Sequence, residues 1–256
     1  MYQWLAVAPA TWYNIHTTAI KEIPILNRAN RNRTAQQKKK RLKKIRQGKN
    51  IPFTIANFPK AIGGITNSYV YKVNVHHCSF ANAKFYSVRY RSGHITQSSF
   101  KGASLISVDF ICVNLKRSKF KGTHFTNCLF FGCDFENADF KNSTFTNTYF
   151  IRCSLKNAKN LNAPNGLQII THYPKLELSN TFETTLYLMS QNSKLEKYSI
   201  LTINKNKNNH WLLNLLLNKY TEKELIYFFK KMLSTNNVQF YTFHDYILSL
   251  SNYYKK

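Results

Sequence analysis

A large apolar residue stands at every fifth position of this chain from residue 65 to residue 155, without a gap. The nineteen residues of this series are Ile65, Val70, Val75, Phe80, Phe85, Tyr90, Ile95, Phe100, Leu105, Phe110, Leu115, Phe120, Phe125, Phe130, Phe135, Phe140, Phe145, Phe150 and Leu155. A small residue stands two positions before most of them. A period of five fits neither an α-helix nor a flat strand. The chain must therefore turn a corner every five residues and coil as a solenoid.

The repeat resembles that of the pentapeptide repeat family, whose consensus is A(D/N)LXX with a central Leu or Phe. The segments most similar to this consensus are Phe135–Phe140 and Leu155–Asn160. The resemblance covers about ninety of the 256 residues. It implies a mainly β fold, a right-handed quadrilateral β-helix with four pentapeptides in each coil. It also implies that the central residue and the small residue two before it point inward.

The solenoid model predicts which side chains stack. One pentapeptide cannot bury its own apolar residue, so neighbouring coils must stack about 4.8 Å apart to form a continuous core. Nineteen repeats give nearly five coils and a length of roughly 23 Å. With twenty residues in each coil, two predicted columns of rings are Phe80, Phe100, Phe120 and Phe140, and Tyr90, Phe110, Phe130 and Phe150.

Changes of pattern divide the chain into three segments. Residues 1–60 form an N-terminal segment that contains a basic arm at about residues 28–49. The β-helix is expected over residues 61–165, because Lys60 occupies a core position and Pro164 and Gly166 cannot continue a ladder. Residues 166–256 form a small α-helical C-terminal region, which we expect to cover the open end of the solenoid, since an open β edge invites pairing.

Helical periodicity and a capping box place the helices of the C-terminal region, and residues 205–209 between them are expected to form a loop. The expected helices lie in Ser179–Gln191, in His210–Tyr220, after the capping box Thr221–Glu224, and in Phe240–Tyr253.

The chain carries 37 Lys and Arg against 11 Asp and Glu. Residues 1–60 hold 13 basic residues and one acidic residue, the repeat holds 13 and 4, and the remainder holds 11 and 6. An AT-rich genome would explain part of the Lys content, but it does not explain the scarcity of acids. The imbalance favours a polyanionic partner, such as nucleic acid, a membrane surface or an acidic protein.

The densest basic run lies in residues 30–48, where only Leu42 and Ile45 are apolar. A helix capped by Thr34 would have almost no face with which to join a core. We interpret this run as an arm that contacts phosphates of nucleic acid or anionic lipid. A nuclear-localisation-like address and a solvated tail are the alternatives. The candidate polyanion-binding residues of the arm are Arg31, Arg33, Lys38, Lys39, Lys40, Arg41, Lys43, Lys44 and Arg46.

Charged residues on the solenoid should also stack in columns, because residues twenty apart lie on the same side. Two columns place a carboxylate between two cations, and Arg89 pairs with Asp109 in the same way. These two columns are Lys116, Glu136 and Lys156, and Lys119, Asp139 and Lys159. A third column, Lys101, Lys121 and Lys141, contains no acid. It is the candidate site on the solenoid for an anionic partner, and a solvated edge is the alternative.

Four cysteines, Cys78, Cys128, Cys133 and Cys153, fall on the small inward position. We interpret them as core residues, because a free Cys behaves as a small apolar side chain. Cys133 and Cys153 lie one coil apart, which is within disulfide range, but a reduced state is expected because no secretory leader is recognised. The adjacent pair His244–Asp245 is interpreted as structural.

The sequence contains no Gly-rich phosphate loop, no nucleophile elbow and no paired metal ligands. It therefore predicts a non-enzymatic interaction scaffold, without metal or other cofactor, that binds nucleic acid or a nucleoprotein complex. One alternative is a protein-binding adaptor or secreted effector that uses its C-terminal helices. Another is a topoisomerase-interacting protein like the quinolone-resistance members of the family. That alternative is disfavoured, because those proteins imitate the negative charge of DNA, whereas this chain is strongly positive. No apolar run is long enough for a membrane span, and a cytoplasmic location is expected.

Overall fold

The computed structural model describes residues 54–58, 60–161, 164–192, 200–204, 207–235 and 240–255. The chain divides into two compact units, residues 1–49 and 50–256, and all described residues lie in the second unit. The basic arm and its nine candidate contacts, from Arg31 to Arg46, lie outside the described residues.

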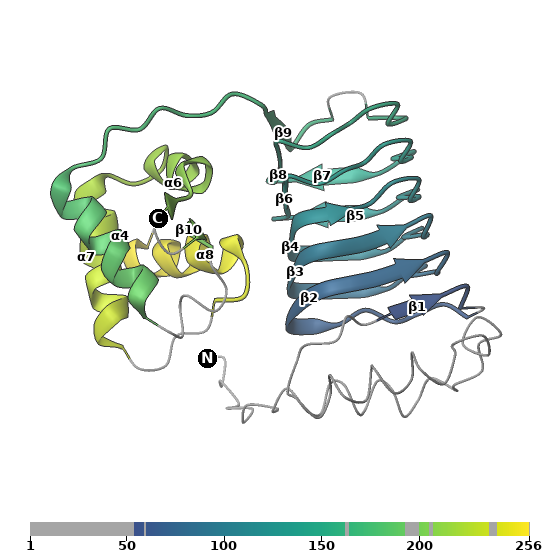
Figure 1. Ribbon diagram of the computed structural model, residues 1–256, viewed down its shortest axis with the longest axis horizontal. Helices are drawn as coiled ribbons and strands as arrows, with labels where there is room; N and C mark the ends of the chain where they lie inside the picture. Colours follow the sequence, from purple (N-terminus) through teal and green to yellow (C-terminus); the bar gives the residue numbers. More distant parts are fainter. Residues whose placement is uncertain are drawn as a thin grey trace, which may run out of the picture. The chain divides into compact units, whose positions relative to one another are not determined.

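Strands β1 to β9 coil into a parallel β-solenoid (Figure 1). They are β1 Thr54–Ala56, β2 Thr66–His76, β3 Lys84–Thr96, β4 Ser104–Asn114, β5 His124–Thr126, β6 Leu129–Phe131, β7 Thr144–Thr146, β8 Thr148–Ile151 and β9 Leu167–Ile170. Paired residues are twenty positions apart along most of the ladder, as at Phe110 and Phe130. One column of bridges runs through six rungs, from Ala61 to Lys159. The solenoid predicted from the period of five is confirmed.

The corners of the coil explain why the period is five. The residue two positions after each central apolar residue has a left-handed backbone, as Asn82 and Asn142 do, both with φ 58°. Asn and Gly adopt this conformation at the lowest cost, and Gly102 and Gly122 occupy two of the corners with φ 66° and 63°. Four such corners in twenty residues give each coil four sides.

The solenoid core contains the predicted residues in the predicted register. Sixteen of the nineteen central residues are buried, and the other three, Ile65, Val70 and Leu155, are partly buried near the two ends. The ring centroids of the first predicted column are 4.9, 5.1 and 5.0 Å apart from Phe80 to Phe140. Those of the second are 4.9, 5.0 and 4.8 Å apart from Tyr90 to Phe150.

Small inward residues bond the coils to one another from inside. The hydroxyl of Ser118 donates to the carbonyl of Ile95 at 2.9 Å, and the thiol of Cys133 donates to that of Phe110 at 3.2 Å. Cys78, Cys128 and Cys133 are buried, Cys153 is half-buried, and all four are free thiols. Burial raises the pKa of Cys128 to about 12. The inward cysteines therefore pack the core, as the sequence indicated.

The solenoid extends beyond both expected ends, near residues 61 and 165. Strand β1 pairs with Asn74–His76 one coil later, and its Ile55 is buried in phase with the central series. A single interruption at Lys60 therefore does not end the coil. Strand β9 pairs with β8 at an offset of nineteen, with Phe150 opposite Ile169. This shift of one residue breaks the period, so the sequence pattern did not reveal the last strand.

The C-terminal region contains helices at all four predicted segments. They are α4 Asn180–Gln191, α6 His210–Leu217, α7 Glu222–Ser234 and α8 Phe243–Tyr254. The predicted capping box at Thr221 and Glu224 is present, and a second box at Thr242 and Asp245 begins α8. A two-stranded antiparallel hairpin, β10 Thr202–Asn204 with β11 Lys207–Asn208, lies between α4 and α6 and includes two residues expected to be loop.

The four helices form a module with its own core, which includes Phe182, Leu212 and Phe229. The same core includes Leu129, Tyr149 and Ile151 of the solenoid strands β6 and β8. The module therefore packs against one side of the solenoid (Figure 1), and the expectation that it covers the open end is wrong. The reason is that most outward residues of this side, such as Leu129, Tyr149 and Ile151, are apolar and the module buries them.

Candidate polyanion-binding surface

The lysine column predicted on the solenoid is exposed and in register. The backbone amides of Gly102 and Gly122 donate to the carbonyls of Lys121 and Lys141, each at 2.9 Å. These bonds place Lys101, Lys121 and Lys141 on three successive rungs. All three side chains are exposed. Their backbones are therefore about 4.8 Å apart from rung to rung.

A second column lies on the same side of the solenoid. Ser99, Lys119, Asp139 and Lys159 are bridged rung to rung. Because the residues before and after a central apolar residue both point outward, the two columns flank Phe100, Phe120 and Phe140 on one surface. We call this surface the lysine face. Its residues are Ser99, Lys101, Lys119, Lys121, Asp139, Lys141 and Lys159.

Five exposed lysines and one carboxylate give the lysine face a net charge of +4. Asp139 Oδ1 accepts hydrogen bonds from the backbone amide of Lys141 at 3.1 Å and from Asn160 Nδ2 at 2.6 Å. The ion pairs found within the described part of the chain do not include Asp139. The expected local compensation of Lys119 and Lys159 by Asp139 is therefore not seen as an ion pair.

Charge is compensated on the neighbouring side, as the sequence predicted. Lys116 Nζ lies 2.6 Å from Glu136 Oε2 and 3.1 Å from Asp134 Oδ2. Hydrogen bonds to these two acids raise the pKa of Lys116, and the bond with Lys116 lowers the pKa of Glu136. Two of the four acids of the solenoid are thus paired with Lys116, and the lysine face keeps its positive charge.

The side of the coil opposite the lysine face carries the helical module. We call this side of the solenoid the docking face. Its residues are Tyr69, Arg89, Asp109, Ile111, Leu129, Phe131, Tyr149 and Ile151. Arg89 Nη1 lies 2.8 Å from Asp109 Oδ2, and the two side chains are 2% and 0% exposed. The sequence indicated this pair as part of the surface, and the structure corrects that expectation, because α8 covers it.

The N-terminus of α8 bonds directly to the docking face. The amide of Phe243 donates to Asp109 Oδ2 at 2.8 Å. The hydroxyl of Ser87 donates to Asp245 Oδ2 at 3.1 Å, while Asp245 also caps α8 by accepting from the amide of Thr242 at 2.9 Å. Burial raises the pKa of Asp109 to about 7, although Arg89 and the Phe243 amide act in the opposite direction. Desolvation is thus the main cost of this contact.

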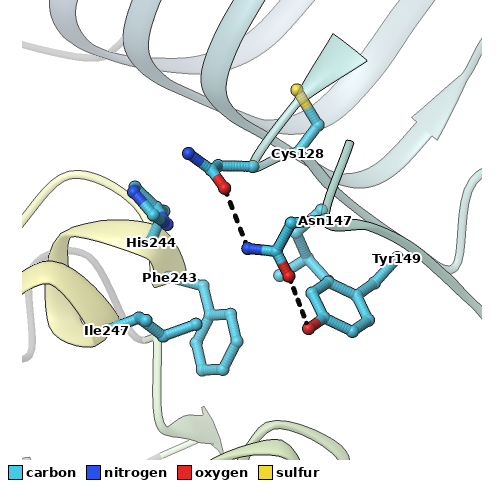
Figure 2. Close-up of a pocket in the computed structure, with 8 residues that line it drawn as sticks. Cys128, Asn147, Tyr149, Phe243, His244 and Ile247 are labelled. Carbon is cyan, nitrogen blue, oxygen red and sulfur yellow. Dashed lines mark hydrogen bonds between the residues drawn. The ribbon is translucent and has the colours of Figure 1, made fainter. Parts of the chain in front are cut away.

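A small cavity of about 10 Å³ lies between α8 and the solenoid beside the docking face. Figure 2 shows residues that line it. Asn147 Nδ2 donates to Asn127 Oδ1 at 2.8 Å, and the Tyr149 hydroxyl donates to Asn147 Oδ1 at 2.9 Å. The rest of the lining is formed by Cys128 and Leu129 of the solenoid and by Phe243, His244 and Ile247 of α8. Burial lowers the pKa of His244. The cavity has room for about one water molecule, so it is a packing gap and not a ligand site.

Sequence reasoning found the lysine column but missed the docking face. The signal was present: outward positions that are polar elsewhere carry Leu129, Phe131, Tyr149 and Ile151 here. When both outward neighbours of a central Phe are large and apolar, that side of the coil has no polar side chains to face the solvent. Such a side is expected to be covered. The interpretation of His244–Asp245 as structural agrees with the capping role of Asp245.

Within the described ranges, no group of three or more His, Cys, Asp or Glu residues is arranged to hold a metal ion. No described helix has both the length and the apolar composition needed to cross a membrane.

Comparisons with known proteins agree with the repeat. The family model described as Pentapeptide repeats matches residues 94–127 and 128–159 with eight copies. No curated protein matched the sequence.

Similar solved structures include two pentapeptide repeat proteins and a fluoroquinolone resistance protein, each 10–12% identical in sequence. A protein from the cyanobacterium Cyanothece 51142 is 11% identical, with 41% of this chain and 86% of that chain covered and a TM-score of 0.23. HetL from Nostoc sp. strain PCC 7120, which is involved in heterocyst differentiation regulation, is 12% identical over 46% and 69%, with a TM-score of 0.24. QnrB1, a plasmid-mediated fluoroquinolone resistance protein, is 10% identical over 53% and 95%, with a TM-score of 0.21.

The period of five, the left-handed corners, the twenty-residue register and the family match describe one architecture. The solenoid of this chain is built of pentapeptide repeats, and its residues 94–127 and 128–159 match the model of that repeat family.

Proposed function

We propose that this protein is a non-enzymatic scaffold that binds a polyanionic partner through its lysine face and its basic arm. The observation that supports the proposal is the charge of the lysine face, where five exposed lysines share one carboxylate. Cations in adjacent rungs repel one another, so the arrangement is unfavourable unless solvent or an anionic partner screens it. A chain of phosphates supplies that screening along the whole column.

The position of the lysine face also supports a binding role. Its central residues, such as Phe120, are ten residues away from those of the docking face, such as Phe130, which is half a coil. The described contacts of the helical module involve the docking face. The lysine face is thus open to a partner while the module remains packed. The basic arm would add nine further cations to the same partner.

A triple substitution tests the proposal. Lys101→Ser, Lys121→Ser and Lys141→Ser together should lower the salt concentration at which the protein elutes from heparin and from immobilised nucleic acid. The matched control changes Lys156, Lys175 and Lys230 to Ser. These lysines are exposed, lie off the lysine face and remove the same total charge. Equal losses from the two triples would show that only net charge matters. No retention of the unmodified protein at low salt would refute polyanion binding altogether.

A further inference from the structure

The lysine face meets a second open side of the solenoid along a row of corners. We call this side the acid-free face, because none of its outward residues is Asp or Glu. Its residues are Thr66, Lys84, Tyr86, Ser104, Ile106, His124, Thr126, Thr144 and Thr146. It is formed by β5 and β7 and by the parts of β2, β3 and β4 that are in register with them. It extends the positive surface with neutral side chains and one further lysine.

The corners between the two faces carry little that would separate them. On the rungs of Lys101 and Lys121 the corner residues are Gly102 and Gly122, which have no side chain. A Cβ atom built on Gly122 would meet no other atom within 4 Å. At Gly122 a ligand that contacts the lysine column can therefore continue onto the acid-free face without crossing a side chain, whereas the side chain of Asn82 lies beside Gly102 and Asn142 occupies the corner on the rung of Lys141.

Two large apolar side chains stand exposed on the acid-free face. Tyr86 is 49% exposed and Ile106 is 38% exposed, and their backbones are directly paired on adjacent rungs. No ring contact of Tyr86 is found among the described residues. Ile106 is on the same rung as Lys101, five residues later around the coil. Single exposed apolar residues are ordinary, but here two in register lie beside a column of cations.

We propose that the edge between these faces binds single-stranded nucleic acid. This inference rests on the proposed function and names the class of polyanion. Phosphates would lie along Lys101, Lys121 and Lys141, and bases would lie over Tyr86 and Ile106. Open binding sites for single strands combine a cationic track with aromatic side chains on which bases stack. A duplex keeps its base faces paired and stacked, so it can use the lysines but not the Tyr86 ring.

The test measures binding of a fluorescein-labelled oligo(dT) of about 20 nucleotides, a duplex of the same length and heparin to the full chain. Tyr86→Ser with Ile106→Ser should weaken oligo(dT) binding about tenfold, since stacking on one aromatic ring changes affinity by that order. Binding of duplex and of heparin should stay unchanged. The lysine triple should weaken all three.

The matched control is Tyr187→Ser with Leu188→Ser on α4, which removes two side chains of similar exposure, 57% and 48%, from the helical module. It should leave oligo(dT) binding unchanged. Equal affinity for oligo(dT) and duplex, with no effect of the Tyr86 and Ile106 changes, would overturn this inference and leave the proposed function standing. Absence of binding to all three ligands would overturn both. Far-ultraviolet circular dichroism of each variant confirms that the fold is kept.

Discussion

Three residue positions carry most of the information in this repeat. The central residue fills the core, the small residue two before it leaves room and bonds to the preceding coil, and the residue two after it turns the corner. The turn residues show the rule most directly, because Asn57, Asn67, Asn127, Asn137, Asn147 and Asn157 all have positive φ. Asn tolerates this conformation better than most residues. The corners therefore favour Asn, although residues such as Lys72, Cys112 and Arg117 also occupy them with positive φ.

Phe120 tests the central position. It is fully buried, and its ring lies 5.1 Å from that of Phe100 and 5.0 Å from that of Phe140. Phe120→Lys should prevent folding, because the charge would be buried without a partner in a dry core. Phe120→Leu should cost no more than about 1–2 kcal/mol, since the core stays apolar and loses little volume. Urea denaturation followed by circular dichroism measures both, and a stable Lys variant would refute the register.

Two glycines with positive φ differ in the space that a side chain would find. Gly93 has φ 156°, and a Cβ atom there would lie 2.3 Å from the carbonyl oxygen of Val73. Gly93→Ala should destabilise the fold by about 1–3 kcal/mol, the usual cost of a strained backbone site. Gly122 has φ 63° and open space around it, so Gly122→Asn should be nearly neutral. Thermal unfolding distinguishes them, and equal shifts in Tm would contradict the argument.

At the scale of elements, local signals predicted most of the structure. The capping box at Thr221 and Glu224 and the apolar spacing of Phe228, Phe229 and Met232 are contained within one helix, so α7 could be read directly. The ring columns followed from the twenty-residue coil. Strand β9 was missed because it is displaced by one residue, and β1 because Lys60 interrupts the series. In both cases backbone pairing continued where the side-chain pattern did not.

The docking of the module could not be predicted from the same signals. Arg89 and Asp109 were correctly paired, since they are twenty residues apart, but a sequence pattern does not show that α8 covers them. The contact joins Asp109 to Phe243, 134 residues later. Neither the sequence around Asp109 nor the sequence around Phe243 indicates that the two residues meet. The lysine column was easier to predict, because its register depends only on the period of the coil.

The buried ion pair gives a prediction at the level of α8. Asp109→Asn should destabilise the protein by about 3–5 kcal/mol, because Arg89 would stay buried without its counter-charge. The loss should appear first as faster hydrogen exchange of the α8 amides, since Asp109 accepts the bond from the Phe243 amide. Hydrogen exchange followed by mass spectrometry gives the local effect, and urea denaturation gives the global effect.

The control for that prediction replaces both charges. Arg89→Met with Asp109→Leu removes the buried charges and the cost of desolvating them. It should be clearly more stable than Asp109→Asn alone, although the Phe243 amide loses its acceptor. A double variant as unstable as the single one would show that the hydrogen bond to α8, and not the uncompensated charge, is what matters.

For the whole molecule, the four sides of the coil have different roles. The docking face is mostly apolar, carries one buried ion pair and holds the helical module. The side of Lys116 carries compensated charge, and the lysine face and acid-free face are open. The division follows from the repeat, since each side carries the two columns of outward residues that flank its central residues. These outward residues can change without disturbing the core. A solenoid can thus present a partner surface on one side while its opposite side is occupied.

The basic arm gives the last prediction, because its sequence offers only Leu42 and Ile45 as large apolar residues with which to join a core. Among the described residues, the solenoid core begins at Ile55. Deleting residues 31–47 should therefore leave the melting temperature and the circular dichroism spectrum of the protein nearly unchanged.

The same deletion should weaken binding to nucleic acid and flatten its dependence on salt. Each phosphate contact that is lost reduces the slope of the logarithm of the binding constant against the logarithm of salt concentration by about 0.7–0.9. Phosphate contacts of the lysine face would account for the salt dependence that remains. Combining the deletion with the Lys101, Lys121 and Lys141 triple should remove most of it. An unchanged slope after the deletion would mean that the arm does not contact phosphates, and a large fall in the melting temperature would mean that it belongs to the folded structure.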